Sequence, residues 1–88
     1  EKKLLGKNYR AHLSATLEAI LTMKQFNNES INSNLLEVVN KSNFKTGDFF
    51  MDLRIAITGS KFTPPINDSI VILGKEETLK RLKKVSSI

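Results

Sequence analysis

The sequence predicts one small domain of the all-α class. Its 88 residues, with a mass of 9.9 kDa, suffice for one modest hydrophobic core. Apolar residues recur at helical spacing along most of the chain, and turn-forming Asn, Ser, Gly and Pro residues separate these stretches. No repeat, low-complexity tract or apolar run of membrane-spanning length occurs. We expect residues 1–88 to form a single domain, and the initial Glu1, in place of Met, suggests a piece of a longer protein.

Two helices are expected in the first half of the chain. The first runs from about residue 8 to residue 26, and residues 27–30 (Asn-Asn-Glu-Ser) then supply turn formers and a candidate N-cap. The second follows and closes at residues 40–43. Apolar residues of both helices follow the i, i+4, i+7, i+8 spacing of a face turned toward a core: Leu13, Leu17, Ile20 and Leu21, then Ile31, Leu35, Val38 and Val39.

Residues 47–58, which Thr46 can cap, fit two structures. Leu53, Ile55 and Ile57 alternate with the period of a strand, in a segment rich in β-favouring residues. One helical face would instead gather Phe49, Phe50, Leu53, Ala56 and Ile57. Gly59 suits the position that follows a helix C-terminus. Periodicity alone leaves strand and helix equally open.

The diproline excludes regular structure in residues 61–65, because proline lacks the backbone donor and restricts its predecessor. Thr63 is expected to cap a fourth helix with Pro64 at its first position. Gly74 ends that helix, and a last helix follows with acidic residues at its start and basic residues toward its end, as the helix dipole favours. The expected buried residues of these two helices are Ile66, Ile70 and Leu73, then Leu79, Leu82 and Val85.

Positive charge is concentrated at the two ends of the chain. The net charge is +5, with 14 basic and 9 acidic residues. Residues 1–10 contribute +3 and residues 75–84 contribute +3, whereas residues 11–74 sum to −1. Such a distribution suits a polyanion such as a nucleic acid, although a solvated helix face would look the same.

Catalytic chemistry has little support. The chain has no cysteine and one histidine, His12, which is more typical of a packed or exposed residue than of a ligand. Asp48 and Asp52 stand at i, i+4 and could hold a hard cation, but solvated surface carboxylates are the preferred interpretation. Gly74-Lys75 lacks the remaining residues of a phosphate-binding loop. We therefore expect no enzyme site and no metal in this chain.

Arg54 stands out because apolar residues flank it. Such a position favours an arginine whose head reaches solvent, pairs with Asp52 or Asp48, or contacts a ligand. The proline-stiffened segment that follows could offer backbone donors and a rigid apolar wall, as proteins do for unstacked single-stranded bases. The residues alone favour the solvated or paired arginine.

Three motifs occur in order: Leu53-Arg54-Ile55-Ala56-Ile57-Thr58-Gly59, then Thr63-Pro64-Pro65, then Ile72-Leu73-Gly74-Lys75-Glu76 with Leu79, Arg81 and Leu82. This pattern resembles the C-terminal end of bacterial-type glutamate–tRNA ligases, which are class I aminoacyl-tRNA synthetases. The resemblance covers about residues 45–85. Pro65 stands where many members have glycine, and Ile66 replaces their common leucine.

The resemblance implies an all-α cage of about five helices that binds the tRNA anticodon, with residues 47–58 helical. Arg54 matches an arginine that hydrogen-bonds anticodon bases. Thr63 and Pro64 match loop positions at the middle anticodon base, and Ile66 matches an apolar position that packs against the anticodon. Candidate phosphate contacts are Lys61, Lys75, Lys80, Arg81 and Lys84.

For the parent protein, the resemblance implies a cytoplasmic enzyme that attaches glutamate to tRNA(Glu), with ATP and Mg bound in an upstream catalytic domain. A monomer is the simplest expectation for its oligomeric state, on which the sequence is silent. This chain would hold no cofactor and contact no membrane. Two other functions fit the residues: a general basic RNA- or DNA-binding helical domain, and a protein-interaction module that uses Phe49, Phe50 and Phe62.

Overall fold

The computed structural model describes residues 5–60 and 65–86, and within them it contains helices and no strand. The helices are α1 (Tyr9–Thr22), α2 (Asn28–Ser42), α3 (Thr46–Thr58), α4 (Ile66–Leu73) and α5 (Lys75–Ser86). The all-α prediction is confirmed, and the ambiguous segment 47–58 is helical. Burial explains why this segment is a helix. As a helix it turns most of its apolar side chains toward the core, and it needs no neighbouring strand to satisfy its backbone hydrogen bonds.

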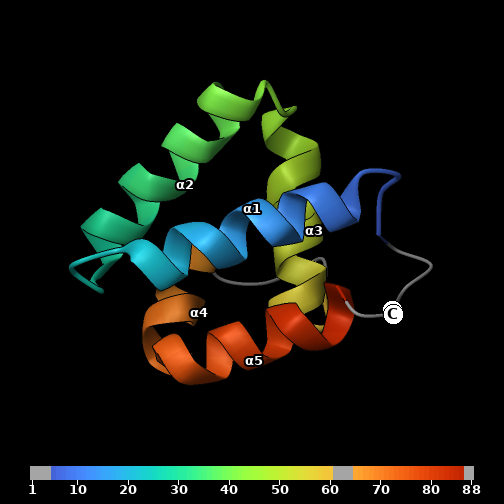
Figure 1. Cartoon of the computed structure of the whole chain (residues 1–88). Coiled ribbons are helices and arrows are strands. Elements are labelled where there is room, and N and C mark those ends of the chain that lie inside the picture. The colour runs from blue at the N-terminus through green and yellow to red at the C-terminus, as the bar shows by residue number, and fades with distance from the viewer. Residues whose placement is uncertain (1–4, 61–64, 87–88) are drawn as a thin grey trace.

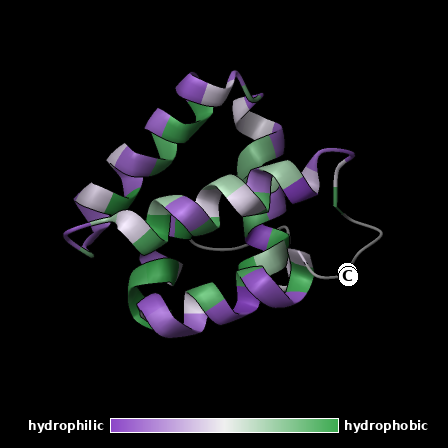
Figure 2. Cartoon of the chain, in the orientation of Figure 1, coloured by the Kyte–Doolittle hydropathy of each residue, from purple (hydrophilic) through white to green (hydrophobic). Residues whose placement is uncertain are grey.

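The helices pack around α1. In Figure 1, α2 and α3 lean together at one end, α1 crosses them, and α5 runs along the opposite side of α1 with the short α4 beside it. Contacts of α1 with α2, α3 and α5 agree with this view, and α4 contacts α2, α3 and α5. Hydrophilic residues lie mainly on the outer sides of the helices in Figure 2.

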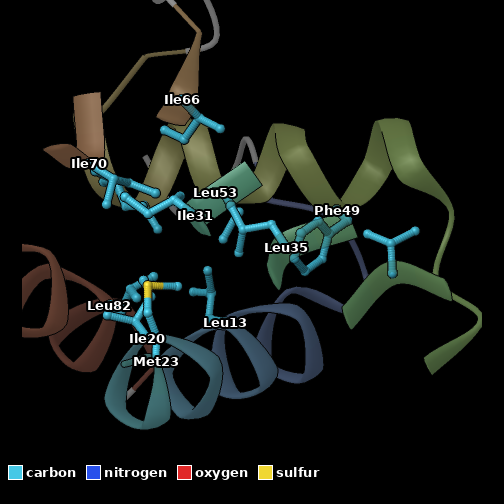
Figure 3. Packing of buried hydrophobic residues seen from close by; sticks show 13 residues of the cluster. Leu13, Ile20, Met23, Ile31, Leu35, Phe49, Leu53, Ile66, Ile70 and Leu82 are labelled. Carbon is cyan, nitrogen blue, oxygen red and sulfur yellow. The ribbon is translucent and has the colours of Figure 1, made fainter. Parts of the chain in front are cut away.

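One hydrophobic core forms between the helices (Figure 3). Its fully buried apolar side chains are Leu13, Ile20, Ile31, Leu35, Phe49, Leu53, Ile57, Ile70 and Leu82. Most of the predicted core residues are therefore confirmed, but Leu21 is 50% exposed. His12 and Thr16 are buried instead. The buried face of α1 therefore differs from the predicted one and includes two polar residues.

The ends of α1 and α2 show how capping sets element length. The prediction that the first helix reaches residue 26 is wrong, because α1 ends at Thr22 and the next residue, Met23, adopts extended backbone. Met23 is buried in the core, so the chain leaves the helix where it turns this side chain inward. The Asn27 side chain caps α2 by accepting a hydrogen bond from the Ser30 N–H at 2.8 Å.

The start of α4 differs from the expectation. Pro65 occupies the N-cap position, so α4 begins at Ile66 and the expectation of a proline at the first helical position is wrong. Thr63, the expected cap, lies outside the described residues.

Gly59 ends α3 in the left-handed region, with φ of +79°, and its N–H donates to the Ile55 carbonyl. We expect Gly59→Ala to lower the free energy of unfolding by about 1–2 kcal/mol, because a β-carbon is disfavoured at this φ. No atom would obstruct that carbon, so the effect is conformational.

Gly47→Ala is the matched control, because Gly47 lies in the first turn of α3, has equally open surroundings and has no positive φ. This variant should be neutral or slightly stabilising. Urea unfolding of both variants measures the difference, and equal stabilities would contradict this account of the helix end.

Candidate nucleic-acid interface

Helix α3 is buried around most of its circumference, and Arg54 lies on the side that remains open. Its buried residues are Phe49, Asp52, Leu53, Ile55, Ala56 and Ile57. At about 100° per residue, these side chains leave one open sector, and Arg54 falls within it beside the half-buried Met51 and Thr58. The fold therefore turns the Arg54 side chain away from the core.

The guanidinium of Arg54 forms no ion pair or hydrogen bond within residues 5–60 and 65–86. The alternative pairing with Asp52 does not occur, because Asp52 faces the opposite side of α3 and pairs with His12. Asp48 is exposed and does not pair with Arg54 either. Arg54 is half-buried, and its donor groups are without a hydrogen-bond partner among the described residues.

The C-terminal end of α3, next to Arg54, is closed by hydrogen bonds. The Thr58 hydroxyl donates to the Arg54 carbonyl at 2.6 Å, and the same hydroxyl accepts from the Ser60 N–H at 3.2 Å. These bonds satisfy groups that a helix end leaves without partners. They also fix the direction in which the chain departs from α3 toward the proline-containing segment.

The predicted loop contacts are only partly covered by the structure. Lys61, Thr63 and Pro64 lie outside the described residues, as does Phe62. Ile66 is described, and it is only 4% exposed because it packs in the core cluster at the start of α4. The structure therefore brings Ile66 close to the point where the predicted loop ends, with most of its side chain turned inward.

Arg81 reaches from α5 to the end of α3. Its Nη1 donates to the Ile57 carbonyl at 2.6 Å, and its Nε donates to Glu77 Oε2 at 2.9 Å. This hydrogen bond, aided by the charge of Arg81, lowers the pKa of Glu77. The pair therefore adds stability above the ordinary carboxyl pKa, and this contribution disappears as the pH falls through the lowered value.

The other predicted phosphate contacts of α5 differ in exposure. Lys80 and Lys84 are exposed, whereas Lys75, at the first position of the helix, is half-buried. All three lie on the helix that carries much of the positive charge of the chain. Their placement gives α5 a basic surface.

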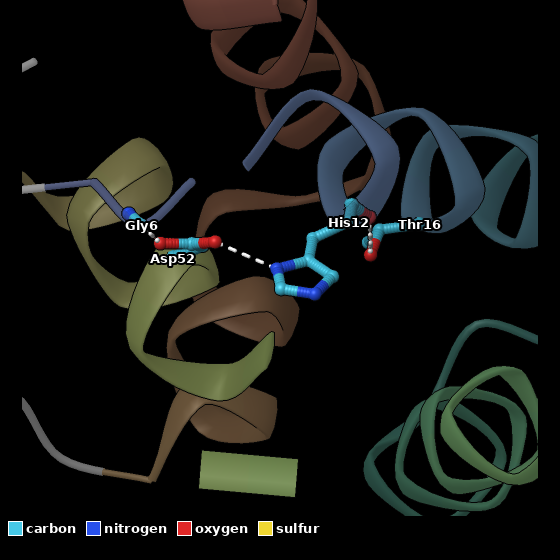
Figure 4. Close-up of polar contacts among 4 residues, drawn as sticks. All are labelled: Gly6, His12, Thr16 and Asp52. Atoms are coloured by element: carbon cyan, nitrogen blue, oxygen red, sulfur yellow. Dashed lines mark hydrogen bonds and ion pairs between the residues drawn. The ribbon is translucent and has the colours of Figure 1, made fainter. Parts of the chain in front are cut away.

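A buried polar cluster anchors the middle of α3 (Figure 4). Asp52 is 1% exposed, its Oδ2 lies 2.6 Å from His12 Nδ1, and its Oδ1 accepts from the Gly6 N–H at 2.9 Å. The Thr16 hydroxyl donates to the His12 carbonyl one turn further along α1. The prediction that Asp52 is a solvated surface carboxylate is wrong, and of the packed and exposed alternatives for His12 the structure shows the packed one.

Aromatic rings enclose this cluster. The His12 ring makes edge contacts with Phe44 and Phe49, whose centroids lie 4.6 and 5.5 Å from its own. Phe49 is fully buried, so the expectation that it could bind a protein partner is wrong, and Phe50 is only half-exposed. Within the described ranges, no group of three or more His, Asp or Glu side chains could hold a metal ion. The cluster has the character of a structural link between α1, α3 and the chain before α1.

None of the helices in the described part of the chain combines the length and apolar character required to span a bilayer.

A family model described as "Anticodon binding domain" matches residues 1–86. The chain belongs to the anticodon-binding domain family. Its ligand class is therefore tRNA, as the sequence motifs suggested, and the open face of α3 lies in the part of the domain that carries those motifs.

Curated relatives of this anticodon-binding domain are named glutamate–tRNA ligases. Glutamate–tRNA ligase 2 of Thermosipho melanesiensis is 36% identical over 88 residues, which are 99% of this chain and 19% of the relative. The ligase of Thermodesulfovibrio yellowstonii is 34% identical over 83% of this chain, and that of Clostridium tetani is 38% identical over 81%. The chain spans less than a fifth of the length of these relatives.

Sequence reasoning missed two features of this anticodon-binding domain. The first is the buried Asp52 cluster, for which the spacing of His12, Thr16 and Ile20 on one face of the first helix was an available signal. The second is the contact of Arg81 with the Ile57 carbonyl, which joins residues far apart in the chain. No local pattern predicts such a contact.

Proposed function

We propose that residues 1–88 are the anticodon-binding part of a longer glutamate–tRNA ligase, and that Arg54 contacts an anticodon base of tRNA(Glu). The observation that carries this proposal is the position of Arg54. Arg54 is half-buried on the open side of α3, and it has no partner within the described residues. An arginine held in this way can present its planar donors to the edge of an unstacked base.

Other residues would support this contact. By the resemblance, Thr63 and Pro64 supply further base contacts, and Ile66, being almost fully buried, would act mainly by holding the start of α4. Lys61, Lys75, Lys80 and Lys84 would neutralise phosphates and position the RNA without reading its sequence. The parent enzyme would be a cytoplasmic monomer that uses ATP and Mg in its catalytic domain, and this part would contribute tRNA binding only.

The proposal is tested by competition between RNA stem–loops that differ only in the anticodon. We expect the chain to bind a stem–loop with a glutamate anticodon at least about tenfold more tightly than one with a substituted anticodon, because lost base contacts cost about 1–3 kcal/mol each.

The same measurement at several salt concentrations separates the proposal from general basic binding. Phosphate contacts weaken with salt for both RNAs, so the ratio of their affinities should persist as both decline. Equal affinities at every salt concentration would indicate a general RNA-binding domain and overturn the proposal.

A further inference from the structure

We infer that Arg81 is a positioning residue for the anticodon site, because it holds the last turn of α3, next to Arg54, in place. This inference rests on the proposed function and gives Arg81 a role other than the phosphate contact that its charge suggests.

The geometry holds the Arg81 guanidinium at two points. Nη1 donates to the Ile57 carbonyl at 2.6 Å, and Nε donates to Glu77 Oε2 at 2.9 Å. Glu77 lies one turn earlier on α5, and both side chains are 40% exposed. The carboxylate thus orients the guanidinium, and the planar fork makes both contacts at once.

The acceptor is a group that α3 cannot satisfy alone. Ile57 is in the last turn of α3, where carbonyls have no partner from within the helix. This end is also the negative pole of the helix dipole, which favours a cation. Arg81 therefore supplies both a hydrogen bond and a favourable charge at this point.

The contact lies close to the proposed base-reading residue. Ile57 is three residues after Arg54 and directly before Thr58, whose hydroxyl donates to the Arg54 carbonyl. A shift of this turn would move Arg54 and also change the direction in which the chain leaves α3. Holding it in place pre-organises the site, since small displacements of a binding group can cost orders of magnitude.

Positioning and phosphate contact predict different results for variants. A phosphate contact needs only a positive charge, so Arg81→Lys would bind nearly normally and Arg81→Ala would reduce the salt slope of binding by about 0.7. A positioning role needs the planar guanidinium with its several donors. Arg81→Lys and Arg81→Ala should therefore both weaken binding of the RNA, while the salt slope of binding stays unchanged.

The experiment measures the affinity of the chain for stem–loops with a glutamate anticodon and with a substituted anticodon, at several salt concentrations. We expect Arg81→Ala and Arg81→Lys to weaken binding of the matched RNA by about tenfold or more, and to lower the preference for it. The salt slope should equal that of the unsubstituted chain. The effects of Arg81→Lys and Arg54→Ala should be less than additive, because both act at one contact.

The same series of variants includes controls that separate weaker binding from loss of folding. Circular dichroism selects a temperature at which each variant is folded, and Glu77→Gln tests the orienting carboxylate if the Arg81 variants do not fold. Glu76→Gln, at the neighbouring exposed position, is the matched control and should bind as the unsubstituted chain does. A preference lowered by Glu77→Gln but not by Glu76→Gln supports the inference.

Two failures are distinguishable. If Arg54→Ala lowers the anticodon preference while Arg81→Lys preserves it, the proposed function stands and the positioning role is overturned. If the unsubstituted chain shows no preference for the matched anticodon, the proposed function itself fails, and the positioning role fails with it.

Discussion

Arg54→Ala is expected to weaken binding of a stem–loop with a glutamate anticodon by roughly ten- to a hundredfold, because a charge-assisted contact to a base edge contributes about 1–3 kcal/mol. Arg54 lies on the open side of α3 and has no partner in the described structure, so its removal should leave the stability of the fold nearly unchanged. Fluorescence anisotropy with labelled RNA measures the affinity, and urea unfolding measures the stability.

Lys41→Ala is the control for loss of one positive charge, since Lys41 is exposed in the last turn of α2. It should reduce affinity equally for matched and substituted anticodons, if at all. Arg54→Lys should recover part of the affinity but little of the preference, because an ammonium lacks the planar pair of donors. An Arg54→Ala variant that binds the matched RNA normally would contradict the assignment.

Asp52→Ala is expected to lower the free energy of unfolding by roughly 3–5 kcal/mol, which is the usual cost of removing one partner from a buried polar pair. The substitution leaves His12 Nδ1 and the Gly6 N–H without their acceptor in a region that water hardly reaches. Urea unfolding measures the loss, and the milder Asp52→Asn gives a measurable value if Asp52→Ala does not fold.

Asp48→Ala is a closely matched control, because Asp48 stands one turn earlier on α3 and is exposed. Its effect on stability should be within about 0.5 kcal/mol. A double variant, His12→Ala with Asp52→Ala, should lose less than the sum of the single losses. Additive losses, or equal effects of the two aspartate substitutions, would show that the buried pair does not act as a unit.

These predictions describe a helix that is held at two points, in its middle and in its last turn. The Asp52 cluster ties α3 to α1 and to the chain before it, and Arg81 ties the last turn of α3 to α5. Between these anchors, the face that carries Arg54 is left open. The arrangement fixes the part of the α3 backbone from which Arg54 extends, and a binding group on a rigid element suits recognition of a particular base.

Periodicity and capping residues were sufficient to predict most of the fold. The i, i+4 spacing of Ile31 and Leu35 identified a buried face, and Gly59 and Gly74 marked helix ends that the structure confirms. Residues 47–58 could not be assigned in this way, because Leu53 and Ile57 satisfy both periods. Contacts with the other helices, which local sequence does not encode, make this segment a helix.

The polar interactions were harder to predict. Asp52 and His12 are 40 residues apart, and Arg81 is 24 residues from Ile57, so neither pairing follows from local spacing. A carboxylate on an amphipathic helix is usually solvated, and only the approach of α1 and Gly6 reverses this expectation for Asp52. The anticodon contacts were predicted from the three sequence motifs and their resemblance to a known family. The structure adds that Arg54 lies on the open side of α3.

The most direct test of the central claim is an NMR measurement of the three arginine side chains, Arg10, Arg54 and Arg81, during titration with RNA. Each guanidinium Nε–H gives its own resonance, and Arg81 serves as an internal reference because its Nε already donates to Glu77. We predict that the Arg54 resonance shifts with a stem–loop carrying a glutamate anticodon and stays in place with a substituted anticodon. An unmoved Arg54 resonance in the presence of saturating matched RNA would contradict the account.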